Sequence, residues 1–99
     1  MENRESYGRQ AELLKALAHP TRLKIVHCLL QSGCRNVTCI EQRTGVSQSC
    51  VSQHLQKLRA AGVVTAERQG NEVFYQVASR AAADVLASLF QETEESHAL

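Results

Sequence analysis

The sequence predicts a mainly α-helical domain that carries one small β-hairpin near its C-terminal end. Apolar residues recur at helical spacing through most of residues 9–61. The period then changes to two strand-like runs around Gln69-Gly70-Asn71, and helical spacing returns in residues 80–90. We therefore expect the order α-α-α-α-β-β-α in a single domain of 99 residues. Residues 1–8 and 92–99 are polar ends that we expect to be flexible.

His19-Pro20 separates the first two helices. The first begins near Arg9 and ends before this pair, because the residue before a proline resists helical backbone angles. Pro20 suits the first turn of the second helix, and His19 is placed to cap it. The second helix ends at 31–33 and is dense enough in apolar residues to form the core. These residues are Leu23, Ile25, Val26, Leu29 and Leu30.

Two shorter helices follow, joined by a tight turn over residues 44–47. Thr38 and Glu41 form a capping-box pattern, so we expect Thr38 to cap the third helix, which ends at Gly45. Ser47 caps the fourth helix, and Gly62 ends it in a left-handed conformation. Its inner stripe is Val51, Leu55 and Leu58. A glycine followed by an apolar residue between two short helices is typical of a helix-turn-helix unit.

The C-terminal third contains the hairpin and the last helix. The strands are expected at 63–68 and 72–77, and Ser79 is expected to cap the helix that follows. The residues expected inside this last helix are Ala83, Leu86, Ala87, Leu89 and Phe90.

The outer face of the fourth helix predicts contact with DNA. Its first half is rich in short or amide side chains, which fit the major groove, where each base pair presents a distinct donor and acceptor pattern. Gln48 and Gln53 can form paired hydrogen bonds with adenine, while Lys57 and Arg59 suit the phosphate backbone. The hairpin would act as a wing that touches a neighbouring phosphate or the minor groove. The predicted DNA-binding residues are Gln48, Ser49, Ser52, Gln53, His54, Lys57, Arg59, Arg68 and Asn71. For His54, a contact with a neighbouring side chain is the alternative.

Charge and composition exclude several other classes. The net charge is only +1, which argues against indiscriminate nucleic-acid binding, although residues 47–71 are mildly basic and the acidic residues gather at the ends. We expect a cytoplasmic protein, because the sequence contains neither a membrane-length apolar run nor a secretory leader. Catalysis is not expected, since the chain has little room for a substrate pocket and no glycine-rich phosphate loop.

The sequence resembles the ArsR/SmtB family of bacterial winged-helix repressors. The resemblance is carried by LLKALAHPTRLKIVHCLL and by VTCIEQRTGVSQSCVSQHLQKLRAAGVVTAERQGNEVFYQV, and runs from about Ala11 to Val77. It implies a winged helix-turn-helix homodimer that represses transcription, binds an inverted-repeat operator and releases it when an inducer binds. It also implies a dimer interface made by the first and last helices. The interface residues would be Leu13, Leu14, Leu17, Val85, Leu86, Leu89 and Phe90.

The chain departs from the family at both of its familiar metal sites. Asn36 and Thr38 stand where metal sensors often carry a Cys-x-Cys pair at the third helix. Asp84 and His97 are too far apart to reproduce the Asp/His cluster of the last helix. We therefore expect neither of these metal sites.

The four cysteines leave the signal open. Cys28 and Cys50 are expected to be small buried hydrophobes. Cys39 is expected at the first helical position, where the helix dipole lowers thiol pKa, and Cys34 precedes it by five residues. One hypothesis is a thiol switch at Cys34 and Cys39, operated by a disulfide or by a thiophilic ion such as arsenite, with Cys28 as a third sulfur ligand. The alternatives are a winged-helix regulator without cysteine-based sensing and a protein-interaction module that has lost DNA binding.

Overall fold

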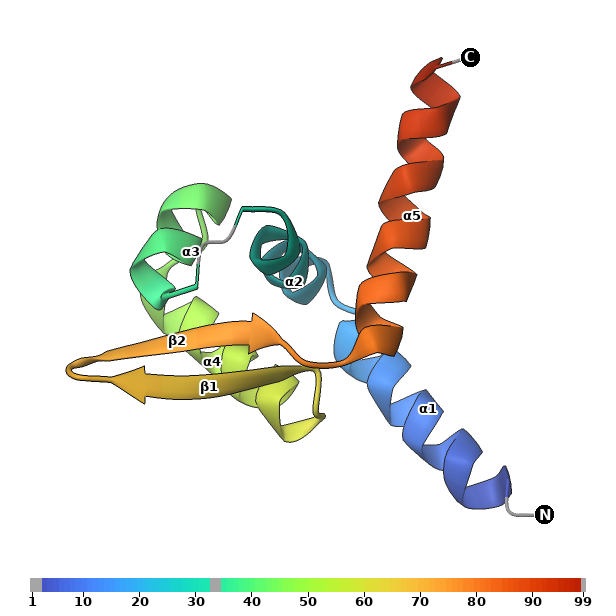
Figure 1. The fold of residues 1–99 in the computed structure, drawn as a ribbon, viewed down its shortest axis with the longest axis horizontal. Helices are drawn as coiled ribbons and strands as arrows, with labels where there is room; N and C mark the ends of the chain where they lie inside the picture. Colours follow the sequence, from blue (N-terminus) through green and yellow to red (C-terminus); the bar gives the residue numbers. More distant parts are fainter. Residues whose placement is uncertain (1–2, 33–34, 99) are drawn as a thin grey trace.

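The computed structural model describes residues 3–32 and 35–98, with side chains described for 6–31 and 35–91. The elements are α1 (Asn3–Leu17), α2 (Pro20–Ser32), α3 (Val37–Thr44), α4 (Gln48–Ala60), β1 (Val64–Gln69), β2 (Glu72–Val77) and α5 (Arg80–Ala98). This is the predicted order (Figure 1).

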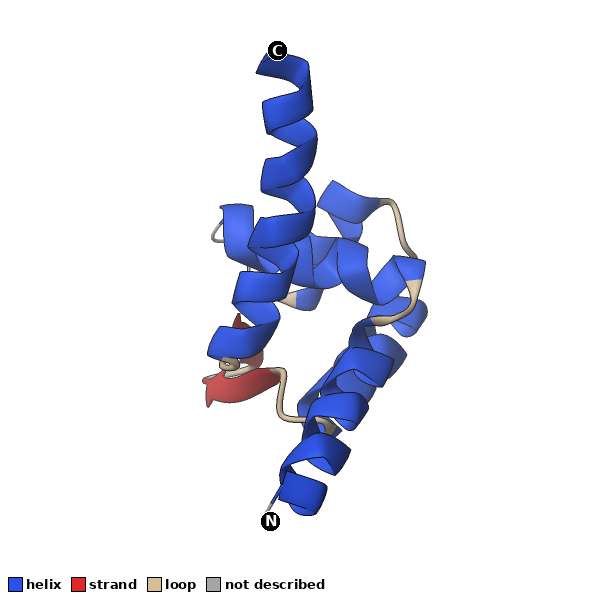
Figure 2. Ribbon diagram, turned by 90° about the vertical axis from the view of Figure 1, so that its right-hand side faces the viewer, coloured by secondary structure: helices blue, strands red, loops and turns tan. Residues whose placement is uncertain are grey.

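The molecule has a compact centre from which three parts project. Helices α2, α3 and α4 pack on one another, and the hairpin lies along α4 (Figure 1). The loop of the hairpin extends from one side of this centre, while α1 and α5 leave the other side in different directions (Figures 1 and 2). The ends of the chain therefore lie far from the hairpin loop.

A single apolar core joins the central helices to the hairpin and α5. The predicted inner stripe of α4 is confirmed, because Val51, Leu55 and Leu58 have no exposed surface. The other fully or almost fully buried large side chains are Ile25, Val26, Ile40, Val63, Val64 and Leu86. Burial of this stripe fixes which face of α4 points outward.

The hairpin is a two-stranded antiparallel pair whose register runs from Val64 opposite Val77 to Gln69 opposite Glu72. Gly70, the first of the two loop residues, has a φ of 64°, a conformation that favours glycine. Side chains alternate across the strands, so Val64 is buried whereas Thr65 is exposed.

Two predicted helix starts are wrong. Helix α1 begins at Asn3 rather than near Arg9, so part of the polar segment also adopts the helix. Asn36, not Thr38, caps α3, because its Oδ1 accepts a hydrogen bond from the Cys39 backbone N–H at 2.8 Å. Cys39 is therefore the third helical residue and not the first.

The other predicted helix ends are confirmed. Gly45 and Gly62 adopt left-handed conformations after α3 and α4, with φ of 78° and 81°. Ser47 Oγ accepts from the Cys50 N–H at 3.4 Å, and Ser79 Oγ accepts from the Ala82 N–H at 3.0 Å.

The predicted inner face of α5 is partly wrong. Leu86 is buried, but Ala82 rather than Ala83 is its fully buried companion. Ala87 is exposed, and Leu89 is 46% exposed. Leu89 lies on the same helix face as Ala82 and Leu86, at spacings of seven and three residues, but it is exposed because α5 projects away from the centre (Figure 1).

Candidate nucleic-acid interface

The turn between α3 and α4 fixes the angle at which α4 is presented. The Gly45 N–H donates to the Glu41 carbonyl at 2.8 Å, and the Val46 N–H donates to Thr44 Oγ1 at 3.2 Å. The half-buried Val46 side chain packs against the core between the helices. These contacts form the predicted helix-turn-helix unit.

The outward face of α4 is polar and unobstructed by other described residues. Gln48, Ser49 and Gln53 are exposed, whereas Ser52 is half-buried. Lys57 and Arg59 are exposed in its last turn. The buried stripe lies behind this surface, so the first half of the helix presents amide and hydroxyl groups to solvent.

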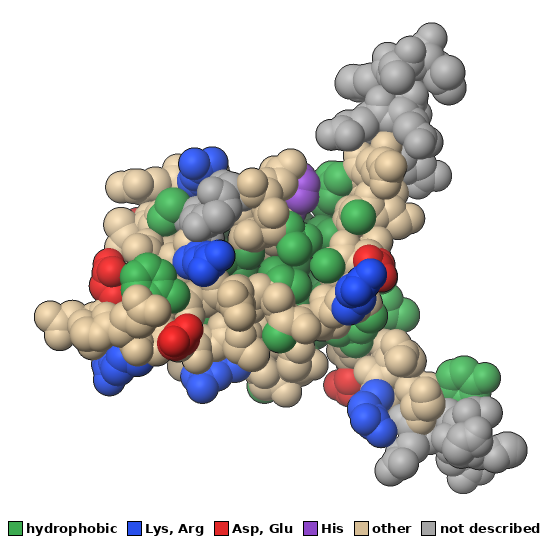
Figure 3. Space-filling view, in the orientation of Figure 1, with side chains coloured by type: hydrophobic (Ala, Val, Ile, Leu, Met, Phe, Trp, Pro, Cys, Tyr) green, Lys and Arg blue, Asp and Glu red, His purple; other side chains and the backbone are tan. Residues whose placement is uncertain are grey.

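The hairpin loop supplies a second polar surface beside α4. Arg68 and Asn71 are exposed, and Arg68 lies opposite Val73 on the neighbouring strand. Basic side chains in Figure 3 lie beneath the hairpin and elsewhere on the visible face, with acidic ones between them. The distribution agrees with the net charge of +1 and shows no continuous basic field on this face.

His54 differs from the other predicted DNA-binding residues, because its ring is turned toward the protein. It is half-buried, and its Nδ1 accepts a hydrogen bond from Arg22 Nε at 3.3 Å. Its ring centroid lies 4.7 Å from that of His19. Burial, His19, Arg22 and Lys57 lower the pKa of His54 from its ordinary value of 6.5.

Arg22 is a residue to which the sequence analysis assigned no role. Its Nη1 donates to the Ala16 carbonyl at 3.1 Å, so one guanidinium joins α1, α2 and α4. His19 does cap α2 as predicted, since its Nδ1 accepts from the Thr21 N–H at 3.1 Å. The only signal for Arg22 in the sequence was its position in the HPTR run that carried the family resemblance.

The helices that project from the centre carry exposed apolar side chains. Leu14 of α1 is 54% exposed and Leu89 of α5 is 46% exposed. Leu17 and Leu86, by contrast, are buried in the core of the protomer itself. Leu13, Val85 and Phe90 are half-buried against that core.

Comparison with known proteins identifies the family. Residues 19–66 match the description "Bacterial regulatory protein, arsR family". The transcriptional repressor PagR of Bacillus anthracis is 51% identical over 67 residues, covering 68% of this chain and 67% of the relative. This chain belongs to the ArsR family.

Solved structures of related proteins share the fold. The crystal structure of PagR superimposes with a TM-score of 0.79 at 41% identity, covering 87% of this chain and 98% of PagR. A winged helix-turn-helix fragment of Mb0332 from Mycobacterium bovis, described as homodimeric, superimposes with a TM-score of 0.79 at 32% identity. This match covers 98% of this chain and 89% of the fragment. The antimony-specific transcriptional repressor AntR superimposes with a TM-score of 0.84 at 30% identity, covering 94% of this chain and 84% of AntR. The predicted winged helix-turn-helix fold is thereby confirmed.

The cysteines of this ArsR-family chain have different surroundings. Cys28 is half-buried and packs against the core, which agrees with its predicted packing role. The prediction for Cys50 is wrong, because this cysteine is exposed and free on the solvent side of α4. Cys39 is half-buried and disulfide-bonded. Cys34 lies outside the described residues, so its pairing with Cys39 stays a prediction.

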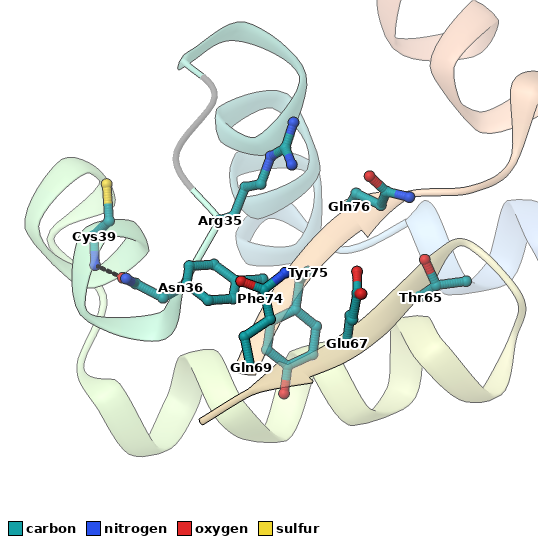
Figure 4. Close-up of a pocket in the computed structure, with 9 residues that line it drawn as sticks. All are labelled: Arg35, Asn36, Cys39, Thr65, Glu67, Gln69, Phe74, Tyr75 and Gln76. Atoms are coloured by element: carbon teal, nitrogen blue, oxygen red, sulfur yellow. Dashed lines mark hydrogen bonds between the residues drawn. The ribbon is translucent and has the colours of Figure 1, made fainter. Parts of the chain in front are cut away.

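A groove of 490 Å³ connects the start of α3 with the hairpin. Arg35, Asn36 and Cys39 line one side, and side chains of both strands line the other (Figure 4). The Tyr75 N–H donates to the Arg35 carbonyl at 2.8 Å, which ties the segment before α3 to β2. The segment that leads into α3 and Cys39 is therefore hydrogen-bonded to the second strand of the hairpin.

The described residues contain neither a cluster of metal-ligating side chains nor a membrane-spanning helix. No group of three or more His, Cys, Asp or Glu side chains among them is arranged to hold a metal ion. Within the same part of the chain, no helix is both long and apolar enough to cross a membrane.

Proposed function

We propose that this chain is a dimeric, sequence-specific DNA-binding transcriptional repressor. The observation that carries this proposal is the polar outer face of α4, held in a fixed orientation by a fully buried stripe and presented beside an exposed wing. Such a helix inserts its N-terminal half into the major groove, where Gln48 and Gln53 contact base edges. Arg68 and Asn71 contact the backbone or minor groove next to it.

Dimerisation is supported by the exposed leucines and by the homodimeric relative. Leu14 and Leu89 lie on helices that project from the centre, so a second copy can cover them. A two-fold dimer places two copies of α4 about one DNA turn apart, which matches an inverted-repeat operator.

Substitutions on α4 test the base contacts. A good bidentate side chain–base pair is worth about 1–3 kcal/mol, so Gln48→Ala or Gln53→Ala should weaken specific binding about 5- to 150-fold. Binding to scrambled DNA should change little. Gln31→Ala, an exposed glutamine at the end of α2, is the matched control. Equal affinity of the wild type and the α4 variants for operator DNA would favour the interaction-module alternative.

Arg68→Ala tests the wing by a different signature. A phosphate contact contributes equally to any sequence, so its loss should weaken binding to operator and scrambled DNA alike. The slope of log affinity against log salt should fall by about 0.9. A sequence-dependent loss would instead assign Arg68 to base recognition.

The signal that we propose is a change of thiol state at Cys39. The disulfide at Cys39 and the Arg35–Tyr75 hydrogen bond support a route from this cysteine to the wing. The related repressor AntR is antimony-specific. A thiophilic metalloid such as arsenite is therefore the second candidate signal, beside oxidation.

Anisotropy with reduced, oxidised and arsenite-treated protein separates the possibilities. We expect reduced protein to bind operator DNA tightly and one of the treatments to release it, with the response lost in Cys39→Ser. Cys50→Ser controls for chemistry at the exposed cysteine of α4. Equal binding in all states would indicate a regulator without cysteine-based sensing, and a response lost in Cys50→Ser would move the sensor to α4.

A further inference from the structure

His19, Arg22 and His54 form a compact group, here called the histidine cluster, where three helices meet. His19 precedes α2, Arg22 lies in its first turn, and His54 lies near the middle of α4. The Arg22 guanidinium bonds His54 and the Ala16 carbonyl at the end of α1, while the His19 ring packs against that of His54. The cluster thus attaches the DNA-binding helix to the base of a helix with an exposed apolar face.

Both histidines use Nδ1 as a hydrogen-bond acceptor. His19 Nδ1 accepts from the Thr21 N–H, and His54 Nδ1 accepts from Arg22 Nε–H. These donors assign the neutral tautomer with its proton on Nε2 to each ring. A second proton on His54 converts its Nδ1 into a donor, which removes the acceptor of the Arg22 Nε–H and sets a cation against the Arg22 guanidinium.

The surroundings of His54 offer little compensation for a positive charge. Arg22 reaches it from α2, and Lys57 lies one turn along α4. The α1 side of the adjoining groove carries Glu12 and Lys15. This Glu12 carboxylate lies 3.8 Å from Lys15 Nζ, and both side chains are more than 70% exposed. Arg22 and Lys57 join burial and His19 in lowering the pKa of His54.

We propose that the histidine cluster is a proton-sensitive attachment of α4 that makes operator affinity fall on mild acidification. The proposal rests on the proposed DNA-binding function. In the neutral state the cluster holds α4 against the junction of α1 and α2. Protonation breaks the Arg22–His54 bond and opposes like charges, which loosens the attachment of α4 to this junction while its buried stripe stays in the core. The resulting shift of α4 weakens the base contacts. His54 acts here as a positioning residue and not as a base contact.

The first test is operator binding at pH 8.0 and pH 5.5 at constant ionic strength. We expect specific affinity to fall between about 5- and 150-fold, the usual range for coupling between sites. Binding to scrambled DNA is measured in parallel to subtract the nonspecific effect of added positive charge. Constant or rising specific affinity at pH 5.5 would overturn the proposal.

Asparagine variants separate protonation from structure. An asparagine amide oxygen takes the place of Nδ1 as an acceptor but does not protonate in this range, and asparagine is also a good N-cap. We expect the double variant His19→Asn with His54→Asn to bind at pH 8.0 and to keep its affinity at pH 5.5. His27→Asn should retain the wild-type fall, because His27 stacks on Phe90 outside the cluster. A wild-type fall in the double variant would overturn the proposal.

A measurement without DNA tests the proton-sensitive attachment of α4 separately from the proposed DNA-binding function. Imidazole resonances and ring-to-ring NMR contacts between His19 and His54 are followed from pH 8 to pH 5. We expect the contacts to disappear as His54 protonates, and their survival when His54 is protonated would overturn the attachment itself. Absence of specific DNA binding at pH 8.0 would instead overturn the proposed function and with it the effect on operator affinity.

Discussion

At the residue scale, the Arg22 side chain joins three helices through His54 and the Ala16 carbonyl. The guanidinium donates to the Ala16 carbonyl and to His54 Nδ1 from two different nitrogens of a rigid planar group, a geometry that a lysine ammonium lacks. The sequence places His54 on the correct helix and leaves DNA or a neighbouring side chain as its contact; in the structure it contacts the neighbouring side chain of Arg22. The position of Ala16 relative to α4 depends on tertiary packing, which helical periodicity does not report.

The lowered pKa of His54 predicts how stability depends on pH. The unfolded chain protonates near the ordinary value of 6.5, whereas the folded chain binds that proton only at lower pH. Between the two pKa values the unfolded state binds more protons than the folded state. The contribution of His54 to the free energy of unfolding is therefore complete above pH 6.5 and is lost as pH falls toward the folded pKa. Urea unfolding between pH 7.5 and 5 should therefore show a fall in stability that is smaller in His54→Asn. An equal fall in both proteins would contradict the assignment to His54.

At the element scale, the start of α3 explains one success and one failure of sequence reasoning. Periodicity and glycine positions located every helix and strand, because each amphipathic face packs on the same core. The cap of α3 was misplaced because Asn36 and Thr38 are both good capping residues and Glu41 favoured Thr38. The hydrogen bond between Tyr75 and Arg35 fixes the preceding segment against β2, and this long-range contact leaves no local signal.

Substitution of the two candidate caps tests this assignment. Asn36→Ala removes the acceptor of the Cys39 N–H and should lower the free energy of unfolding by about 1 kcal/mol. Thr38→Ala removes an exposed side chain that does not cap the helix and should change stability by less than about 0.5 kcal/mol. Chemical denaturation of both variants gives the comparison. A larger loss of stability in Thr38→Ala than in Asn36→Ala would favour the predicted capping box of Thr38 and Glu41 instead.

At the scale of the whole molecule, some apolar residues of α1 and α5 are buried in the core, and others are exposed on the proposed dimer surface. The family resemblance assigned seven residues to the interface, but Leu17 and Leu86 are buried within one protomer. Periodicity identifies an apolar face and does not say which of its residues pack internally. Exposed fraction separates Leu14 and Leu89 from the rest.

Charge at these two leucines should abolish dimerisation. Leu14→Glu combined with Leu89→Glu places carboxylates in the proposed apolar contact, which burial would strongly disfavour. We expect light scattering to show monomers, and operator affinity to fall by at least about 100-fold as the two half-sites become uncoupled. Thr65→Glu, an exposed change on the hairpin, should remain dimeric. A dimeric double variant would place the interface elsewhere.

The most direct test of the central claim is the affinity of reduced protein for its own upstream DNA relative to a scrambled duplex. Fluorescence anisotropy at pH 8.0 and fixed salt gives both values. Specific recognition by α4 predicts at least about 1,000-fold tighter binding to the upstream DNA, with two protomers per site. Equal affinity for the two duplexes would contradict the assignment of this chain as a sequence-specific repressor.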